Sequence, residues 1–595
     1  MAKKKPQITQ DSELNTLVDW VNAADDATID TRNLADTSRN YYDSEQWTGA
    51  EKKKLEKQKQ AATVINRIKP KMDGLMGMER ANRTTAKAFP RTPKHQVAST
   101  AATEAVRFVL DDNFYHQRRS DAWDNLLIEG TCGVEVIVDP DNNYRVRIQN
   151  IMWDRLIYDP HSRRKDFSDA KWLGQVVWMD YDDALEKYPA AGDVLESMQT
   201  GSSTYEDRPR WMDNTRKRVK IVELYYRKKA SIWYACFTRG GFCEAPKECP
   251  YLNEEGEHEW PYEFASLFVT REGDRYGACR QLIDIQDEVN KRRSKALHLM
   301  SVRQVRWERG AVEDINKARA ELAKPDGVIE TTPGMEFEVL KTGDMATAQF
   351  HLLTEAKSEI DAVSYNAAAA GKDIRNMSGV ALRNRELASQ TEVAPMFDVL
   401  KHLDIRVYRK VWNRIRQYWK KEKWIRVTDD PNSLKWVGLN RPVTRGDTLL
   451  QAAQQQGVQP EQLQMIQARI ASDPMMQEVV ETENELAQLD VDIVMADAPD
   501  TVTQQVEDFQ TLGEMVKSGF PIPPIAVIEA SPLANKDRII KMMQESPQLP
   551  PQMQEEMKQL QEQAQKLAQE NQALKQDQQS EQAKLALSAQ EAQAK

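Results

Sequence analysis

Four aspartates in one short segment are the strongest candidates for binding metal ions. They are Asp154, Asp159, Asp166 and Asp169. A two-metal nuclease needs several convergent carboxylates to hold its divalent ions. Asp159 and Asp169, however, stand at turn or capping positions, where a carboxylate accepts hydrogen bonds from backbone N–H groups. We therefore predict a structural role for this cluster, with a nuclease as the alternative.

The remaining chemical motifs argue against an enzyme or a cofactor. The five cysteines are Cys132, Cys236, Cys243, Cys249 and Cys279, an odd set that does not suggest a disulfide framework. Three of them precede His258 closely enough for a zinc site, but the short Cys-x2-Cys spacing is missing. The AAAAGKD segment lacks the first glycine and the hydroxyl of a phosphate-binding loop. We predict no catalytic residue, cofactor or metal.

Basic side chains are concentrated in two places. The first is a helical pattern that carries Lys291, Arg292, Arg293 and Lys295. The second flanks a predicted helix break at Gly371 and Ser378-Gly379 and contains Lys372, Arg375, Arg383 and Arg385. The first group is either a solvated surface or a contact for an acidic partner or DNA phosphate. The second is either a plain helix-breaking connector with charged ends or a contact for DNA.

Composition limits the function classes. The chain has 595 residues and a formal net charge of -10, so a general nucleic-acid binder is disfavoured and any DNA contact must be local. The length predicts two to four domains. No apolar run is long enough to span a bilayer, and no apolar segment follows the lysine-rich start, so we expect synthesis in the cytoplasm and no membrane partner.

Periodicity predicts a mostly helical α+β protein. Helical signals occupy residues 1–60 and 63–83. An α+β module follows at about 85–275, in which a second helix breaks near Gly130 and alternating strand patterns come after it. Residues 276–301 and 352–370 are predicted helices on either side of a short mixed segment. A long helix, bent at Pro395, then runs to about residue 425. Three later strands flank a Gln-rich helical insert at 448–489, and we expect them to return to the α+β module.

Two further groups of residues indicate packing surfaces. Tyr408, Trp412, Tyr418, Trp419 and Trp424 crowd the end of the long helix and are predicted to lie in the core or at a subunit interface. Past residue 547 a heptad seam runs through Met553, Met557, Leu560, Leu567 and Leu574. Ala564 and Asn571 weaken this seam, so only a high local copy number would hold the helices together.

Four sequence blocks, in this order, carry a family resemblance. They are NRIKPKMDGLMGMERANR from Asn66, WDRLIYDPHSRRKDFSDAKW from Trp153, GKDIRNMSGVALRNRELASQ from Gly371 and VDIVMADAPDTVT from Val491. The chain resembles the portal proteins, or head-to-tail connectors, of podovirus-type bacteriophages. The resemblance implies a portal fold with an α+β wing, a long-helix stem, a small clip insert, a helical crown and a C-terminal helical barrel segment.

The resemblance also implies a division of the chain. The expected parts are an N-terminal helical arm (1–60), the wing (61–275), a stem helix (276–301), the clip (302–345), a second stem helix (346–370), a tunnel loop with the long kinked helix (371–425), a return to the wing (426–499), the crown (500–546) and the barrel helix (547–595). Lys372, Arg375, Arg383 and Arg385 would then lie at the DNA channel.

The function implied by the resemblance is a conduit. A ring of twelve copies would sit at one capsid vertex of the virion and pass double-stranded DNA during packaging and ejection. Its partners would be the large terminase subunit, the major capsid and scaffolding proteins, and tail adaptor proteins. The alternative from another class is an oligomeric cytoplasmic scaffold without a DNA channel.

Overall fold

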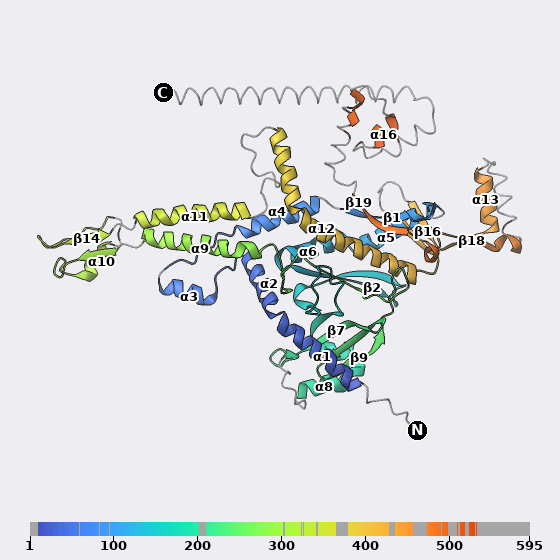
Figure 1. Cartoon of the computed structure of the whole chain (residues 1–595), viewed down its shortest axis with the longest axis horizontal. Coiled ribbons are helices and arrows are strands. Elements are labelled where there is room, and N and C mark those ends of the chain that lie inside the picture. The colour runs from blue at the N-terminus through green and yellow to red at the C-terminus, as the bar shows by residue number, and fades with distance from the viewer. Residues whose placement is uncertain are drawn as a thin grey trace. The chain divides into compact units, whose positions relative to one another are not determined.

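The computed structural model describes most of residues 10–497 and short stretches between 509 and 539 (Figure 1). The gaps in the first range are 59, 82–83, 94–95, 201–209, 302–303, 323, 325, 341–342, 364–378, 428–434, 456–469, 471–472 and 490. The chain divides into two units, Met1–Asp497 and Ala498–Lys595. The features below belong to the first unit, apart from one short helix.

The described residues form a mostly helical α+β protein, as the sequence predicts. The helices are α1 (Gln10–Ala27), α2 (Ile29–Tyr42), α3 (Gly49–Lys57), α4 (Ile68–Ala81), α5 (Gln96–Asp112), α6 (Tyr115–Ile128), α7 (Tyr181–Lys187), α8 (Gly192–Thr200), α9 (Arg280–Ser301), α10 (Ile315–Leu322), α11 (Gly343–Val363), α12 (Gly379–Tyr418), α13 (Arg445–Gln455) and, in the second unit, α16 (Pro524–Glu529). The strands are β1 (Thr84–Pro90), β2 (Thr131–Asp139), β3 (Arg145–Ile151), β4 (Leu156–Tyr158), β5 (Trp172–Asp180), β6 (Met212–Asp213), β7 (Arg218–Lys228), β8 (Ser231–Thr238), β9 (Gly241–Glu248), β10 (Tyr262–Ser266), β11 (Phe268–Val269), β12 (Arg275–Tyr276), β13 (Gln304–Trp307), β14 (Phe337–Leu340), β15 (Lys423–Val427), β16 (Lys435–Leu439), β17 (Arg441–Thr444), β18 (Val479–Glu483) and β19 (Val491–Asp497).

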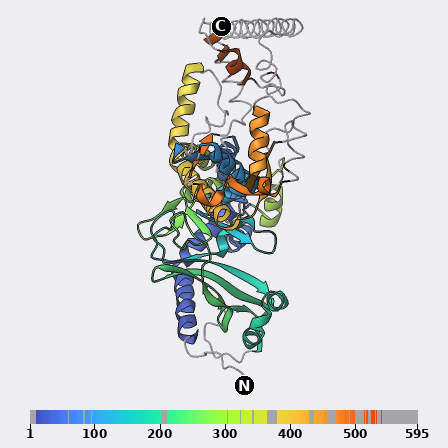
Figure 2. The same ribbon diagram turned by 90° about the vertical axis from the view of Figure 1, so that its right-hand side faces the viewer.

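The largest sheet is antiparallel and is covered on both faces. Its order is β4-β5-β7-β8-β9, with β6 paired to β7. The apolar stripe of α1, which includes Leu17 and Val21, packs on one face with Trp172 and Phe237. Helices α7 and α8 cover the other face, where Ile221 is buried. Figure 2 shows α1 and the α7–α8 pair on opposite sides of these strands.

The main core lies around α12. Helices α4, α5 and α6 and the three-stranded sheet β10-β2-β3 contribute to it. The predicted stripe of α12 is buried, which confirms its helical spacing: Val393, Met396, Leu400, Leu403, Val407 and Val411. Pro395 lies inside α12, and Figure 1 shows the helix changing direction along its length, as predicted.

Two local predictions are wrong. The helix expected from residue 63 begins only at Ile68, because the backbone N–H groups of residues 63, 65 and 67 are bonded to side chains of α9 instead. The Gln-rich insert is not wholly helical: after α13 it contains a 3-10 turn and β18. Of the later strands, β19 pairs with β1, whereas β15 and β17 pair with β16 and β18 as separate ribbons. Among the later strands that the structure describes, β19 alone therefore pairs with an earlier strand.

None of the helices in the described part of the chain combines the length and the apolar character needed to cross a lipid bilayer.

The three-stranded sheet carries a buried carboxyl, Glu135, that lies within reach of the charge of Glu223 on the largest sheet. Glu135 of β2 is 8% exposed and stands opposite Tyr262 of β10. Burial, followed by the charge of Glu223 on β7, raises the pKa of Glu135 to about 7, and Lys187 opposes this shift only in part. The fold therefore favours the protonated carboxyl.

This pKa predicts that Glu135 makes stability depend on pH. The folded state binds the proton of Glu135 more tightly than the unfolded state does. The protonated carboxyl therefore stabilises the fold fully below about pH 4.5, and this stabilisation is lost as the pH rises through about 7. Glu135→Gln should flatten the fall in thermal stability over this interval and stabilise the protein near pH 8 by roughly 1–3 kcal/mol. Thermal unfolding measured across the interval tests this. Glu56→Gln on exposed α3 is the control, and an unchanged pH profile in Glu135→Gln would contradict the account.

Candidate functional site

The two helices α9 and α11 pack side by side as a hairpin (Figure 1). Their contact is a small apolar core in which Val289 of α9 is buried with Leu353, Ala356 and Ile360 of α11. The chain between the helices contains α10 and the antiparallel ribbon β13–β14, in which Trp307 pairs with Phe337. The hairpin therefore has a core of its own along the helices.

A row of buried polar side chains lies along α9. Gln286, Asn290 and Ser294 are four residues apart, so they share one face of the helix, and each is at most 1% exposed. We call these three residues the side-chain ladder. Burying such groups is unfavourable unless they find hydrogen-bond partners, and their partner is the extended segment 63–67, which we call the strap.

Every second backbone N–H of the strap donates a hydrogen bond to a side chain of the ladder. The bonds are Thr63 N–H to Ser294 Oγ (3.2 Å), Ile65 N–H to Asn290 Oδ1 (3.0 Å) and Arg67 N–H to Gln286 Oε1 (3.0 Å). The Gln286 side-chain amide also donates to the Ile65 carbonyl at 2.7 Å. Four helical residues advance about 6 Å and two extended residues about 6.6 Å, so the repeats match over this length.

Further polar contacts tie the hairpin to the N-terminal helices. The Tyr41 hydroxyl of α2 donates to Asp287 of α9. At the other helix, Asp361 of α11 pairs with Arg67 (2.8 Å) and Lys71 (3.0 Å). Partial burial opposes ionisation of Asp361, but these two cations outweigh it and hold its pKa below the usual value. Both helices of the hairpin are thus anchored.

The predicted basic stripe lies on α9 and is largely occupied within the hairpin. Lys291 pairs with Asp287 at 2.7 Å, and Arg292 pairs with Glu288. The Arg293 guanidinium lies 5.8 Å from the Phe350 ring centre on α11. Lys295 is exposed. The stripe is therefore a surface of alternating charge rather than a continuous positive band.

The other predicted site residues fall partly outside the described structure. Arg383 and Arg385 lie in the first turns of α12, where the backbone alone is described. The sites that lie outside the described residues are Lys372, Arg375, Met553, Met557, Leu560, Leu567 and Leu574. Their predicted roles remain predictions.

The aspartates of the 154–169 cluster accept hydrogen bonds from their own loop. Asp159 accepts the backbone N–H groups of His161 (3.0 Å) and Lys171 (3.1 Å). Asp169 accepts hydrogen bonds from Arg163 N–H and Ser162 Oγ, both at 2.7 Å. Burial opposes its ionisation, yet these bonds lower the pKa of Asp169 below its usual range. The carboxylates hold their own loop, as predicted.

The cysteines do not converge on a metal site. All five are buried with free thiols. Cys236 and Cys243 belong to the core under α7 and α8, whereas Cys249 belongs to the main core. Within the described residues, no group of three or more potential metal ligands occurs.

A buried ionic group fixes α12 against α4 and α6. Arg119 pairs with Asp404 at 2.7 Å and also with Glu79, and all three side chains are at most 3% exposed. The Tyr115 hydroxyl donates to the second Asp404 oxygen at 2.8 Å. The sequence analysis predicted neither the ladder nor this ionic group. In both, the side chains that bond to each other lie far apart in the sequence.

The segment between α9 and α11 buries little apolar surface. Among the described residues from 304 to 340, Ala311 is the one apolar residue that is buried. Trp307, Val328 and Val339 are 42%, 81% and 42% exposed. A two-stranded ribbon with so little core is at best marginally stable alone, so contacts from another molecule would stabilise this segment.

Comparison with known families identifies the chain. The Phage P22-like portal protein family matches residues 18–240 and 227–595, which is most of the sequence. The chain belongs to this phage portal protein family. Portal proteins are structural proteins of the virion at a capsid vertex, where they act as oligomers and interact with capsid proteins and terminase. No curated protein matches the chain.

The ladder predicts that Asn290 contributes measurably to the contact between the strap and α9. Asn290→Ala would leave the Ile65 N–H and the Gln46 side chain, which accepts from Asn290 at 2.6 Å, without this partner in a buried site. We expect a loss of about 1–3 kcal/mol in unfolding free energy. Lys295→Ala on the exposed face of the same helix should change it by less than about 0.5 kcal/mol. Denaturant unfolding compares the two, and equal stabilities would contradict the role of the ladder.

Proposed function

We propose that twelve copies of this chain form a ring at one capsid vertex. Double-stranded DNA passes through its channel during packaging and ejection. Membership of the portal family supports this proposal. The copy number of twelve is the one implied by the sequence resemblance.

The single observation that carries the proposal is the incomplete packing of the α9–α11 hairpin and its tip. The helices bury one face against each other, but the segment between them leaves Trp307, Val328 and Val339 exposed. Exposed apolar groups of this kind mark protein interfaces. In a ring, neighbouring tips would cover each other, which is the covering that this segment needs.

The charges of the chain suit a conduit for DNA. Its formal net charge is -10, and three of the four cations in the α9 stripe are engaged within the hairpin. Each phosphate contact adds affinity and salt dependence. A channel wall with few free cations would let a duplex slide rather than bind it. We assign the few contacts with DNA phosphates in the channel to Lys372, Arg375, Arg383 and Arg385.

The parts of the ring follow from the same proposal. The stem is formed by α9 and α11. The clip between them faces the large terminase subunit and later the tail adaptor proteins. The wing, which includes the large sheet, faces the major capsid and scaffolding proteins. Residues 500–546 form the crown, and the helices past residue 547 bundle through the Met553 to Leu574 seam.

The mass and projection of the purified full-length chain test this proposal. Light scattering on a sizing column should give about twelve times the 68.3 kDa chain mass. Negative-stain images should show rings with a channel of roughly 20 Å or more, the width that a DNA duplex requires. Rings without such a channel would favour the scaffold instead, and a monomer, dimer or filament would overturn the proposal.

The assigned channel contacts make a separate prediction. Replacing Arg383 and Arg385 by glutamine should leave the ring mass unchanged, weaken the binding of duplex DNA to the purified ring several-fold and make that binding less dependent on salt. The reason is that two phosphate contacts are lost from each copy. Lys52→Gln with Lys53→Gln on exposed α3 removes the same charge as a control. Unchanged DNA affinity and salt dependence in the arginine variant would contradict this assignment.

A further inference from the structure

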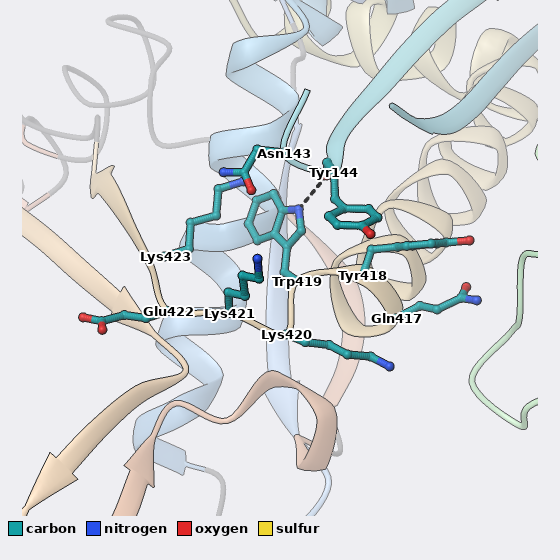
Figure 3. Close-up of a pocket in the computed structure, with 9 residues that line it drawn as sticks. All are labelled: Asn143, Tyr144, Gln417, Tyr418, Trp419, Lys420, Lys421, Glu422 and Lys423. Carbon is teal, nitrogen blue, oxygen red and sulfur yellow. Dashed lines mark hydrogen bonds between the residues drawn. The ribbon is translucent and has the colours of Figure 1, made fainter. Parts of the chain in front are cut away.

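A pocket of about 400 Å³ lies where the end of α12 meets the turn between β2 and β3 (Figure 3). Residues 417–423 form one wall, and Asn143 and Tyr144 of the turn form the other. Three of the lining residues are lysines and one is a glutamate. All of them belong to the first unit, so a single copy of the chain contains the whole pocket.

The three lysines of the pocket have no acidic partner. In the described structure, none of the Lys420, Lys421 and Lys423 side chains forms an ion pair. Lys420 and Lys421 are exposed, whereas Lys423 is half-buried. Burial lowers the pKa of Lys423, and its ammonium lies 3.6 Å from the Trp419 ring centre. A charge that is partly withdrawn from water normally has a counter-charge, so the position of Lys423 indicates a site for an anion.

Two carboxylates lie near these lysines, and both are bonded to other groups. Glu422 accepts a hydrogen bond from the Trp424 indole N–H at 2.9 Å, and Figure 3 shows its carboxylate pointing away from the aromatic rings. Asp112 favours the charged form of Lys423, but its two oxygens accept from Arg145 at 2.7 and 2.8 Å. The charge of Arg145 also acts on Lys423 and opposes its ionisation. The pocket therefore carries an excess of positive charge.

Hydrogen bonds from within the chain hold the walls of the pocket. The Trp419 indole N–H donates to the Tyr144 carbonyl at 2.9 Å, as Figure 3 shows. The Asn440 side-chain amide donates to the carbonyls of Trp419 (2.7 Å) and Lys421 (3.3 Å). The backbone that carries the lysines is therefore fixed before a ligand binds, which lowers the entropic cost of binding.

The rings of the pocket favour a peptide over a nucleic acid. Tyr144 and Tyr418 stack on each other, with ring centres 5.8 Å apart, and Tyr251 meets Tyr418 edge-on at 6.2 Å. Trp419 is 5% exposed and has Lys423 over its face. Among the lining rings this leaves Tyr144 exposed, whereas single-strand binding uses a series of free aromatic faces. A duplex, roughly 20 Å wide, is too large to enter the pocket and reach Lys423.

We propose that this pocket binds an acidic segment of a partner protein. Carboxylate side chains of that segment would pair with Lys420, Lys421 and Lys423, since carboxylates form charge-assisted hydrogen bonds with ammonium groups. The exposed ring of Tyr144 offers an apolar contact for the stems of the same side chains. Each copy in the proposed ring would then present one docking site for an acidic partner. The pocket lies within one copy, so this proposal does not depend on the number of copies.

Calorimetric titration of the full-length chain with acetylated hexaglutamate tests the pocket. We expect saturable binding that weakens as salt is added. Lys420→Gln with Lys421→Gln should weaken it about fivefold, because exposed ion pairs contribute little individually. Lys423→Gln should weaken it about tenfold, because a half-buried charge is screened less by solvent and salt. Lys423→Arg keeps the charge and should retain most of the affinity.

A matched control separates the pocket from net charge and from folding. Lys52→Gln with Lys53→Gln on α3 removes two charges from another surface and should keep the affinity of the unaltered chain. Circular dichroism of each variant should show unaltered secondary structure. No binding of hexaglutamate, unchanged affinity in the pocket variants, or an equal loss in the control would each overturn the proposed site.

A duplex DNA probe tests the rival ligand on the same variants. The pocket replacements should change duplex affinity no more than the α3 control does. A loss of duplex affinity in the pocket variants, with hexaglutamate binding unchanged, would assign the pocket to nucleic acid and overturn the proposal. The mass of the unaltered chain, measured by light scattering on the same sample, tests the proposed ring separately from all of these outcomes.

Discussion

The ladder of polar side chains on α9 is the constraint on which the rest of the proposed stem depends. Gln286, Asn290 and Ser294 are buried, and the strap supplies the backbone N–H groups that such side chains need. The dependence is mutual, because the extended strap has no neighbouring strand in the described structure to accept those N–H groups. Since an unpaired buried polar group destabilises a fold by about 1–3 kcal/mol, strap and helix hold each other in one register. The direction of α9 therefore follows from residues more than two hundred positions earlier in the chain.

The same principle appears where α12 meets the body of the protein. Arg119 lies between Glu79 and Asp404, and none of these side chains reaches solvent. Removing one partner from such a group leaves a buried charge, so the group specifies one docking geometry for α12. The residues assigned to the channel lie between α11 and α12 or in the first turns of α12. Asp361 with Arg67 and Lys71 holds α11, and the ionic group holds α12. The chain thus fixes α12 by a buried ionic group and α11 by ion pairs at the surface.

Sequence alone predicted what local patterns determine. The apolar spacing of α12 and the interruption at Pro395 were sufficient to predict a long, bent helix. The capping role of Asp159 and Asp169 was also readable, because turn positions carry their own signal. The strap was misread as helix because Ile65 continues the apolar spacing of α4, while its true partners are on α9. The pairing of Lys291 and Arg292 with acids one turn earlier was available from the sequence, since i to i+4 pairs face each other. The ladder and the Arg119 group were not predictable, because tertiary contacts alone distinguish a buried polar residue from a solvated one.

The family assignment and the exposed surfaces lead to the same account. A ring would cover the tip of the hairpin, where a single copy leaves Trp307, Val328 and Val339 in solvent. A single-particle reconstruction of the assembled full-length chain tests this account most directly. The account predicts a closed ring whose α9–α11 hairpins surround a bore wide enough for a DNA duplex, with the strap on the ladder in every copy. A particle without a central bore, or one whose hairpins make no contact with neighbouring copies, would contradict it.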